Sequence, residues 1–272
     1  MLFNIYFSAK GTTQKCADYI SGIVDPDTVS QNLLNIIAPN HLELQANDVL
    51  LLSMPVYGGY IPHHCIDMVK QIKGKNTPAI ILAVFGNRHF DNALIQMQDL
   101  VEANGFKVIA AGAFLAEHSI FPSVATGRPD AEDYGFMKQF AEKCRAILSS
   151  DSWHDKKLTV PGLKDYDPSA FKGVPFHPDA DNSCTNCQKC VNICPMQAIS
   201  STNPKETDGQ KCISCGACIS VCPVKARDYH ALAYKAVKVA FELKCKEKKY
   251  PFTYFITNFA SSIASAFVLA YE

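Results

Sequence analysis

Eight of the twelve cysteines lie between residues 184 and 222, where one spacing occurs twice. Each run reads Cys-x-x-Cys-x-x-Cys-x-x-x-Cys-Pro, and the second run follows the first at an offset of 28 residues. The first run is Cys184, Cys187, Cys190 and Cys194, and the second is Cys212, Cys215, Cys218 and Cys222. Such internal repetition predicts a small pseudo-symmetric domain.

This spacing is typical of iron-sulfur ligands. Three closely spaced cysteines can hold three corners of a four-iron cube, and in the bacterial two-cluster pattern the last cysteine of each run crosses to the other cluster. A zinc site would use two Cys-x-x-Cys pairs with histidines or a longer spacer, and has no use for this tandem pattern. We therefore predict two 4Fe-4S clusters. The first cysteine set is Cys184, Cys187, Cys190 and Cys222; the second cysteine set is Cys194, Cys212, Cys215 and Cys218.

Composition narrows the classes of protein and of partner. The chain has 272 residues with 26 basic and 26 acidic side chains, a balance that argues against a nucleic-acid-binding protein. Residues 1–7 lack the features of a signal peptide, so we expect a cytoplasmic protein whose clustered cysteines bind metal. The apolar tail at residues 256–271 is too short to span a bilayer, so we expect no transmembrane segment. We expect this tail to pack on the protein.

Alternating apolar runs and helical patterns precede the cysteines. The expected strands are residues 2–7, 28–33, 49–54, 79–85 and 107–115, and the expected helices are 14–20, 62–72, 91–104 and 130–148. This alternation predicts an α/β domain with a doubly wound, five-stranded parallel sheet, which binds ligands in the loops beyond the carboxyl ends of its strands. The predicted organisation is a domain at 1–149, a linker at 150–182, the cysteine-rich domain at 183–228, and a C-terminal helix with an apolar tail at 229–272.

The loop after the first expected strand has the composition of a phosphate site. Ser8, Thr12 and Thr13 supply hydroxyl groups, and Gly11 allows close approach of the backbone at the start of a helix, where the helix dipole favours a dianion. Lys10 either pairs with the phosphate or points to solvent. A plain helix cap is the alternative interpretation of this loop.

Two more loops follow neighbouring strands at the same expected edge of the sheet. The first contains Pro55, Val56, Tyr57 and Gly58, in which an aromatic ring and flexible glycines suit stacking against a planar ring. The second contains Gly86, Asn87 and Arg88, which offer an open backbone, an amide and a charge to a heterocycle. Together with the first loop, they predict a flavin mononucleotide (FMN) site.

The sequence resembles the fused flavodoxin/ferredoxin family of anaerobic bacteria and archaea, to about residue 256. The resemblance is carried by YFSAKGTT at 6–13, PVYGGYIP at 55–62, FGNRHFDNAL at 85–94, EHS at 117–119, GRPD at 127–130, and both cysteine runs. It implies a flavodoxin-like domain that binds FMN through the three loops, followed by a small α+β ferredoxin domain with two clusters. Flavodoxin loops usually carry threonine where this chain has Lys10.

Three functions fit these parts. The first is electron transfer between two 4Fe-4S clusters and FMN, which couples one-electron carriers to a redox partner protein or a small acceptor. The second is a flavin reductase that reduces a small acceptor, with His118 as a candidate catalytic proton donor at the flavin edge. The third is a flavin-free two-cluster ferredoxin whose flavodoxin-like domain serves for docking. For His118, hydrogen bonding to neighbouring loop residues is the competing interpretation, and for Arg128 we expect a carboxylate partner that fixes a loop. No Gly-x-Gly-x-x-Gly motif follows a strand, which disfavours direct oxidation of a nicotinamide.

Overall fold

The computed structural model describes residues 1–35, 41–150, 152–163, 165–170 and 173–256. Five parallel strands form its main sheet. They are β1 (Leu2–Tyr6), β2 (Thr28–Asn32), β4 (Val49–Pro55), β6 (Thr77–Phe85) and β7 (Phe106–Leu115). Their spatial order is β2-β1-β4-β6-β7. This is the 2-1-3-4-5 order of flavodoxin-like sheets, so the predicted doubly wound fold is confirmed.

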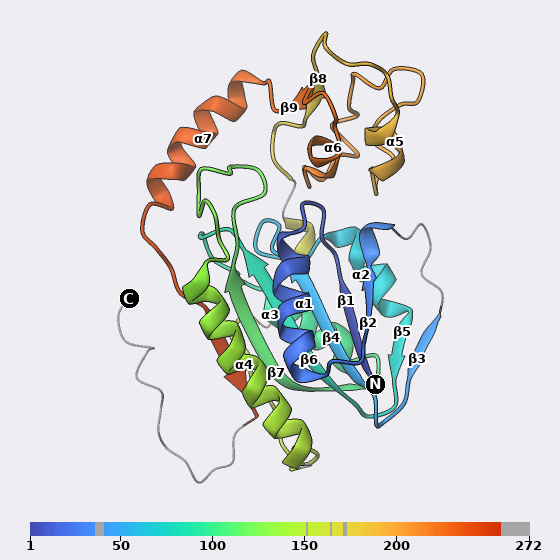
Figure 1. Cartoon of the computed structure of the whole chain (residues 1–272), viewed down its shortest axis with the longest axis vertical. Helices are drawn as coiled ribbons and strands as arrows, with labels where there is room; N and C mark the ends of the chain where they lie inside the picture. The colour runs from blue at the N-terminus through green and yellow to red at the C-terminus, as the bar shows by residue number, and fades with distance from the viewer. Residues whose placement is uncertain (36–40, 151, 164, 171–172, 257–272) are drawn as a thin grey trace.

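Helices cover both faces of the sheet, as a parallel sheet requires. One face carries α1 (Thr12–Val24) and α4 (Ala131–Ser150), and the other carries α2 (His63–Lys70) and α3 (Ala93–Glu102) (Figure 1). Every residue of β6 is buried between these layers. Burial on both sides explains why the strands read as unbroken apolar runs rather than as alternating patterns.

Three short strands that lie in the N-terminal domain or join its sheet were not predicted. β3 (Leu42–Leu44) and β5 (Ile72–Gly74) form a separate parallel pair, so the predicted helix at 62–72 ends at Lys70 and Ile72 lies in a strand. β10 (Phe252–Phe255) pairs antiparallel with β7 and extends the edge of the main sheet. The chain therefore returns to the N-terminal sheet after the cysteine-rich region.

The segment expected to be a linker packs on the N-terminal domain. Trp153, Leu158 and Val160 are buried in its core, and the Gln98 side-chain amide donates to the Leu158 carbonyl at 2.8 Å. A 3₁₀ turn, η2, spans Pro168–Ala170. Farther along, β8 (Asp179–Ala180) pairs with β9 (Arg227–Asp228) and so closes the cysteine-rich region. The domain boundaries themselves stay predictions.

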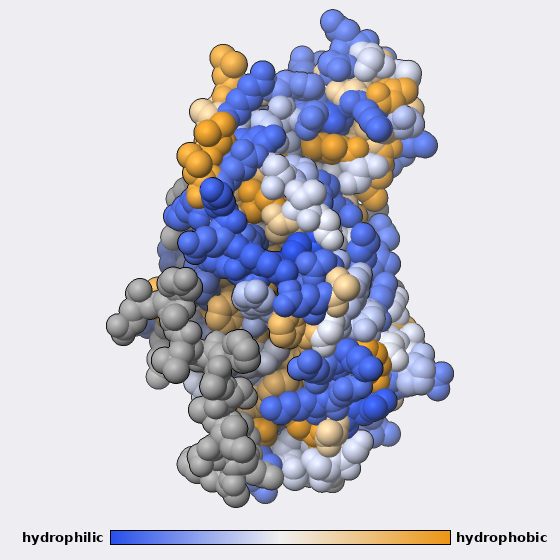
Figure 2. All heavy atoms as spheres, turned by 60° about the vertical axis from the view of Figure 1, so that its left-hand side comes forward, coloured by the Kyte–Doolittle hydropathy of each residue, from blue (hydrophilic) through white to orange (hydrophobic). Residues whose placement is uncertain are grey.

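The C-terminal helix α7 (Leu232–Lys244) is shorter than the expected 229–249 and lies beside both domains. Its Tyr234 hydroxyl donates to the Ile120 carbonyl at 3.1 Å, and its Phe241 ring lies 5.0 Å from the ring of Phe121. The opposite face of α7 exposes apolar side chains (Figure 2), among them Leu232 and Leu243. Among the described residues, no helix has the length and apolar character needed to cross a membrane. The tail expected to pack on the protein lies outside them from residue 257 onward.

Candidate functional site

The cysteine-rich region has a repeated backbone as well as a repeated sequence. Left-handed backbone conformations occur at Asn186, Gln188 and Gln197 and recur 28 residues later at Ser214, Gly216 and Lys225. Gln188 precedes α5 (Lys189–Ile193), and Gly216 precedes α6 (Ala217–Ser220). The internal repeat predicted from the cysteines is thus confirmed in the local structure.

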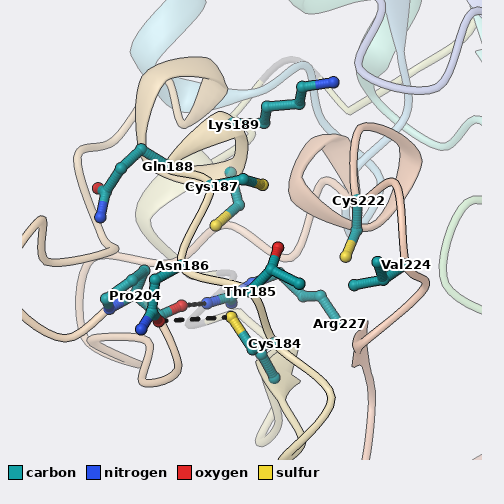
Figure 3. A pocket seen from close by; sticks show the side chains of 12 residues that line it. Cys184, Thr185, Asn186, Cys187, Gln188, Lys189, Pro204, Cys222, Val224 and Arg227 are labelled. Carbon is teal, nitrogen blue, oxygen red and sulfur yellow. Dashed lines mark hydrogen bonds between the residues drawn. The ribbon is translucent and has the colours of Figure 1, made fainter.

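The structure brings the first cysteine set to one cavity. Cys184, Cys187, Cys190 and Cys222 all line it. Figure 3 shows the labelled cysteines pointing toward the same space from two separate segments. Cys187 is exposed, and the other three are half-buried. The last cysteine of the second run therefore joins the first three of the first run.

The second cysteine set lines a second cavity, formed by Cys194, Cys212, Cys215 and Cys218. Cys215 and Cys218 are each only 8% exposed, so this cavity is the more buried of the two. Two backbone amides point at its sulfurs: Ala198 N–H donates to Cys194 Sγ and Ser214 N–H donates to Cys212 Sγ, each at 3.3 Å. Amide hydrogen bonds of this kind stabilise sulfur that carries negative charge.

The spacing of both sets suits a ligand larger than a single ion. Within the part of the chain that the structure describes, no three His, Cys, Asp or Glu side chains are grouped so that they could hold one metal ion. Burial raises the pKa of Cys215 and of Cys218 to about 12, so these thiols ionise only when a metal replaces the proton. Four sulfurs around a cavity fit the corners of a cluster.

The first loop of the N-terminal domain is fixed from two sides. The Asn32 side chain accepts from Ser8 N–H and donates to the Ser8 carbonyl, each at 3.1 Å. Ser8 Oγ accepts from Gln14 N–H in the first turn of α1. Gly11 has φ +83° and open space where a side chain would stand, so the backbone remains accessible at the start of the helix. Asn32 was not predicted, because nothing near it in sequence marks it as a partner of the loop.

The other residues of this loop occupy different environments. Thr12 is the first residue of α1 and is half-buried, whereas Thr13 is buried. Lys10 is half-buried, and its Nζ donates to the Ser119 carbonyl at 3.2 Å. Lys10 thus connects the first loop to the segment after β7.

The second loop is a tight turn at the end of β4. Tyr57 and Tyr60 exchange two backbone hydrogen bonds, and Gly58 and Gly59 between them have φ of +62° and +93°. Pro55 ends the strand, and Val56 and Tyr57 are half-buried against the core. The turn therefore holds the Tyr57 ring at the carboxyl edge of the sheet.

The third loop differs from the expectation in the use of its side chains. The Asn87 amide donates to the carbonyls of Cys245 and Glu247, each at 2.8 Å, and its oxygen accepts from Lys249 N–H. Arg88 pairs with Asp91. The side chains of Asn87 and Arg88 thus make contacts within the protein. Of the three residues predicted in this loop, Gly86 is the one that has no side chain and could contact a ligand through its backbone.

The second cysteine set packs directly on these loops. A Cβ at Gly216 would lie 3.1 Å from Lys10 Cδ, so only glycine allows this approach without a shift of the lysine. Val56 and Tyr57 pack against the hydrophobic cluster to which Cys215 and Ala217 belong. Burial raises the pKa of Tyr57 well above 10, and the neighbouring Cys215 raises it further. In Figure 1 the cysteine-rich region lies over the carboxyl ends of the strands.

His118 lies beside the third loop, but its ring is held by its neighbours. Nδ1 accepts from the backbone N–H groups of Ile120 and Phe121, at 3.2 and 3.1 Å. The ring lies 4.7 Å from the ring of Phe241, and a Cβ at Gly86 would clash with His118. Burial lowers the pKa of His118 to about 4, with Lys10 and Arg88 adding to the effect. His118 is therefore neutral at pH 7, with its Nδ1 already engaged.

The neutral ring of His118 predicts a loss of stability in mild acid. Its pKa falls from 6.5 to about 4 on folding, so the unfolded chain binds the proton first. Stability should be lost as the pH drops below 6.5, by about 2 kcal/mol between pH 7.5 and 5. In His118→Asn, Oδ1 can still accept the two N–H bonds but cannot titrate, so urea unfolding should show a flatter pH profile. The exposed His41→Asn serves as control; a profile unchanged by His118→Asn contradicts the prediction.

Arg128 fixes a loop through a carboxylate, as predicted. Its guanidinium group makes two hydrogen bonds to Asp133, and both side chains are buried. It also donates to the Lys249 carbonyl at 3.1 Å. Arg128 therefore holds the C-terminal segment against the loop before α4. Its side chain has a structural role.

Comparison with known proteins finds a family match for the cysteine-rich region. Residues 183–226 match the 4Fe-4S dicluster domain family. Comparison with curated proteins finds no match to this chain. Among solved structures, the chain is similar to a flavodoxin from the domain Archaea, at 12% identity over 54% of this chain and 98% of that chain, with a TM-score of 0.38. It is also similar to a flavodoxin of Streptococcus pneumoniae TIGR4, at 15% identity over 56% and 99%, with a TM-score of 0.39.

A third similar structure belongs to a larger protein. Rubredoxin oxygen:oxidoreductase from Desulfovibrio gigas is 13% identical over 55% of this chain and 36% of that chain, with a TM-score of 0.40. The strand order identifies the flavodoxin-like fold independently of these similarities. The chain therefore joins a flavodoxin-like domain to a 4Fe-4S domain, and the predicted combination is confirmed. Domains of both kinds are suited to electron transfer.

Proposed function

We propose that this protein transfers electrons between two 4Fe-4S clusters and a bound FMN, and passes them to or from a redox partner. The first cysteine set would hold one cluster and the second set the other. The proposal extends the family match, which supports 4Fe-4S binding in residues 183–226. The crossed ligand sets are supported by the two cavities, each of which is lined by the four cysteines of one set.

The FMN site of this proposal uses the three loops at one edge of the sheet. Ser8, Gly11, Thr12 and Thr13 would hold the phosphate, since Gly11 leaves open space at the start of α1 and the helix dipole favours a dianion there. The turn at Pro55–Gly58 and the backbone at Gly86 would border the flavin ring. FMN supplies one- and two-electron chemistry, and the protein positions the ring and excludes water. Asn87, Arg88 and Lys10 support the site through protein contacts in this proposal.

The observation on which the proposal depends most is the packing of the second cysteine set on these loops. Tyr57 packs against the hydrophobic cluster to which Cys215 belongs, and Gly216 contacts the Lys10 side chain. The second cluster would then be the neighbour of the flavin. No cysteine of the first set belongs to this hydrophobic cluster, and Cys187 is exposed. We therefore assign the first cluster to exchange with external partners and the second cluster to exchange with FMN.

An anaerobic reconstitution tests this function. The full chain, loaded with iron, sulfide and FMN, should hold about eight irons and one flavin and show the visible spectra of both. A reductive titration should then show electrons moving from the clusters to the flavin. A protein with iron but without FMN after reconstitution would contradict the proposal and favour the flavin-free carrier.

The reductase alternative receives no support from His118. Its Nδ1 accepts two backbone hydrogen bonds, and the neutral ring packs against the rings of both Phe121 and Phe241. Both features suit a structural residue of the interface better than a proton donor to an acceptor. Loss of acceptor reduction in His118→Asn, with transfer from clusters to flavin intact, is the result that would restore the reductase hypothesis.

A further inference from the structure

Arg227 is a buried cation of the cysteine-rich region for which neither the ligand pattern nor the family match gives a role. Its side chain is 1% exposed and is the largest of the fully buried side chains. It also lines the cavity of the first cysteine set, beside Cys184 and Cys222 (Figure 3). The Arg227 side chain therefore forms part of the cavity wall, together with a cysteine from each of the two runs.

The hydrogen-bond partners of Arg227 are all neutral. Nη1 donates to the Pro178 carbonyl at 2.7 Å and to Thr207 Oγ1 at 2.6 Å, and Nη2 donates to the carbonyls of Pro204 and Lys205. Nε is buried and has no hydrogen-bond partner among the described residues. None of the ion pairs found among those residues includes Arg227.

An uncompensated buried charge is costly, because the interior solvates it poorly. Neutral carbonyls orient the guanidinium group but do not cancel its charge. The groups beside it that become negative are the cysteine sulfurs once they hold iron. Arg227 shares the wall of its cavity with Cys184 and Cys222, which belong to the first set.

We propose that Arg227 is the internal counter-ion of the 4Fe-4S region and raises the reduction potential of the cluster held by the first cysteine set. A one-electron reduction makes a cluster more negative, and a fixed cation in the cavity wall stabilises that form. This inference rests on the proposed clusters but not on FMN. A raised potential suits a cluster that accepts electrons from external partners.

A redox titration of the reconstituted full chain, followed by electron paramagnetic resonance, tests the proposal. The reduction step that is missing in Cys187→Ser identifies the first cluster. In Arg227→Gln this step should move to a more negative potential, by at least about tenfold in its equilibrium constant, which is 59 mV for one electron. Arg227→Lys keeps the charge and should stay within about threefold of the native protein. Equal shifts in both variants, or none, would overturn the proposal.

A second pair of variants covers the case in which Arg227→Gln does not retain iron. Thr207→Asp places a carboxylate at the atom that accepts from Nη1, which compensates the cation while the guanidinium group stays in place. Its first cluster should shift in the same negative direction, whereas the control Thr207→Ser should match the native protein. An unshifted Thr207→Asp overturns the role of Arg227. A native protein that holds no cluster overturns both this inference and the proposed function, whereas unshifted potentials overturn this inference alone.

Discussion

Cys215→Ser should retain about four irons and one FMN per chain, yet transfer electrons from its remaining cluster to the flavin at least about 100-fold more slowly than the native protein. Cys215 is a member of the second set, and Tyr57 of the second loop packs against the hydrophobic cluster to which Cys215 belongs. Loss of its cluster would therefore remove the electron carrier next to the flavin. Stopped-flow absorbance after mixing with a limiting one-electron reductant measures the rate of flavin reduction.

Matched cysteine variants separate this effect from a general loss of iron. Cys187→Ser removes an exposed ligand of the first set and should also leave about four irons, but with rapid transfer to the flavin. Cys222→Ser should behave like Cys187→Ser, although Cys222 belongs to the second run in sequence. Cys194→Ser should behave like Cys215→Ser for the converse reason. If Cys222→Ser instead resembles Cys215→Ser, the crossed ligand sets are wrong.

The two repeats differ in sequence in a way that indicates which of them is covered by the N-terminal domain. Gln188 and Lys189 of the first repeat correspond to Gly216 and Ala217 of the second, at the same offset of 28 residues. Lys189 is exposed and Ala217 is 1% exposed, because the second repeat packs on the N-terminal domain. Small residues in one repeat and polar residues in the other therefore indicate which repeat is covered. The cysteine spacing, which is identical in both runs, could not show this.

Contacts between distant segments were beyond the reach of sequence reasoning. The parallel strands could be predicted because burial on both faces makes each an apolar run. By contrast, β10 has only four residues, and its position depends on an open edge at β7 supplied more than a hundred residues earlier. The partners of Asn87 are also distant in sequence. Its position in a loop after a strand suggested a ligand contact, but its amide donates to the carbonyls of Cys245 and Glu247. Neither partner is marked in the local sequence.

Gly11→Asp should weaken FMN binding by about 100-fold while lowering the stability of the protein no more than Gly11→Asn does, which separates a ligand effect from a folding effect. Gly11 precedes α1 and has no neighbour within 4 Å of the position that a Cβ would take. A carboxylate there would repel the phosphate of FMN. The same carboxylate is favourable to the helix itself, because the N-terminus of a helix attracts negative charge. Fluorescence titration with FMN and urea unfolding measure the two effects.

Gly11→Asn is the matched control, because asparagine has almost the shape of aspartate and lacks its charge. Both residues tolerate the left-handed conformation at φ +83° better than other non-glycine residues do. The asparagine variant should therefore bind FMN within about tenfold of the native protein, and the difference between the two variants measures the electrostatic contribution of the loop to phosphate binding. Gly22→Ala, at an exposed position inside α1, should leave FMN affinity unchanged. Equal affinities of the aspartate and asparagine variants would place the phosphate away from Gly11 and remove the first loop from the site.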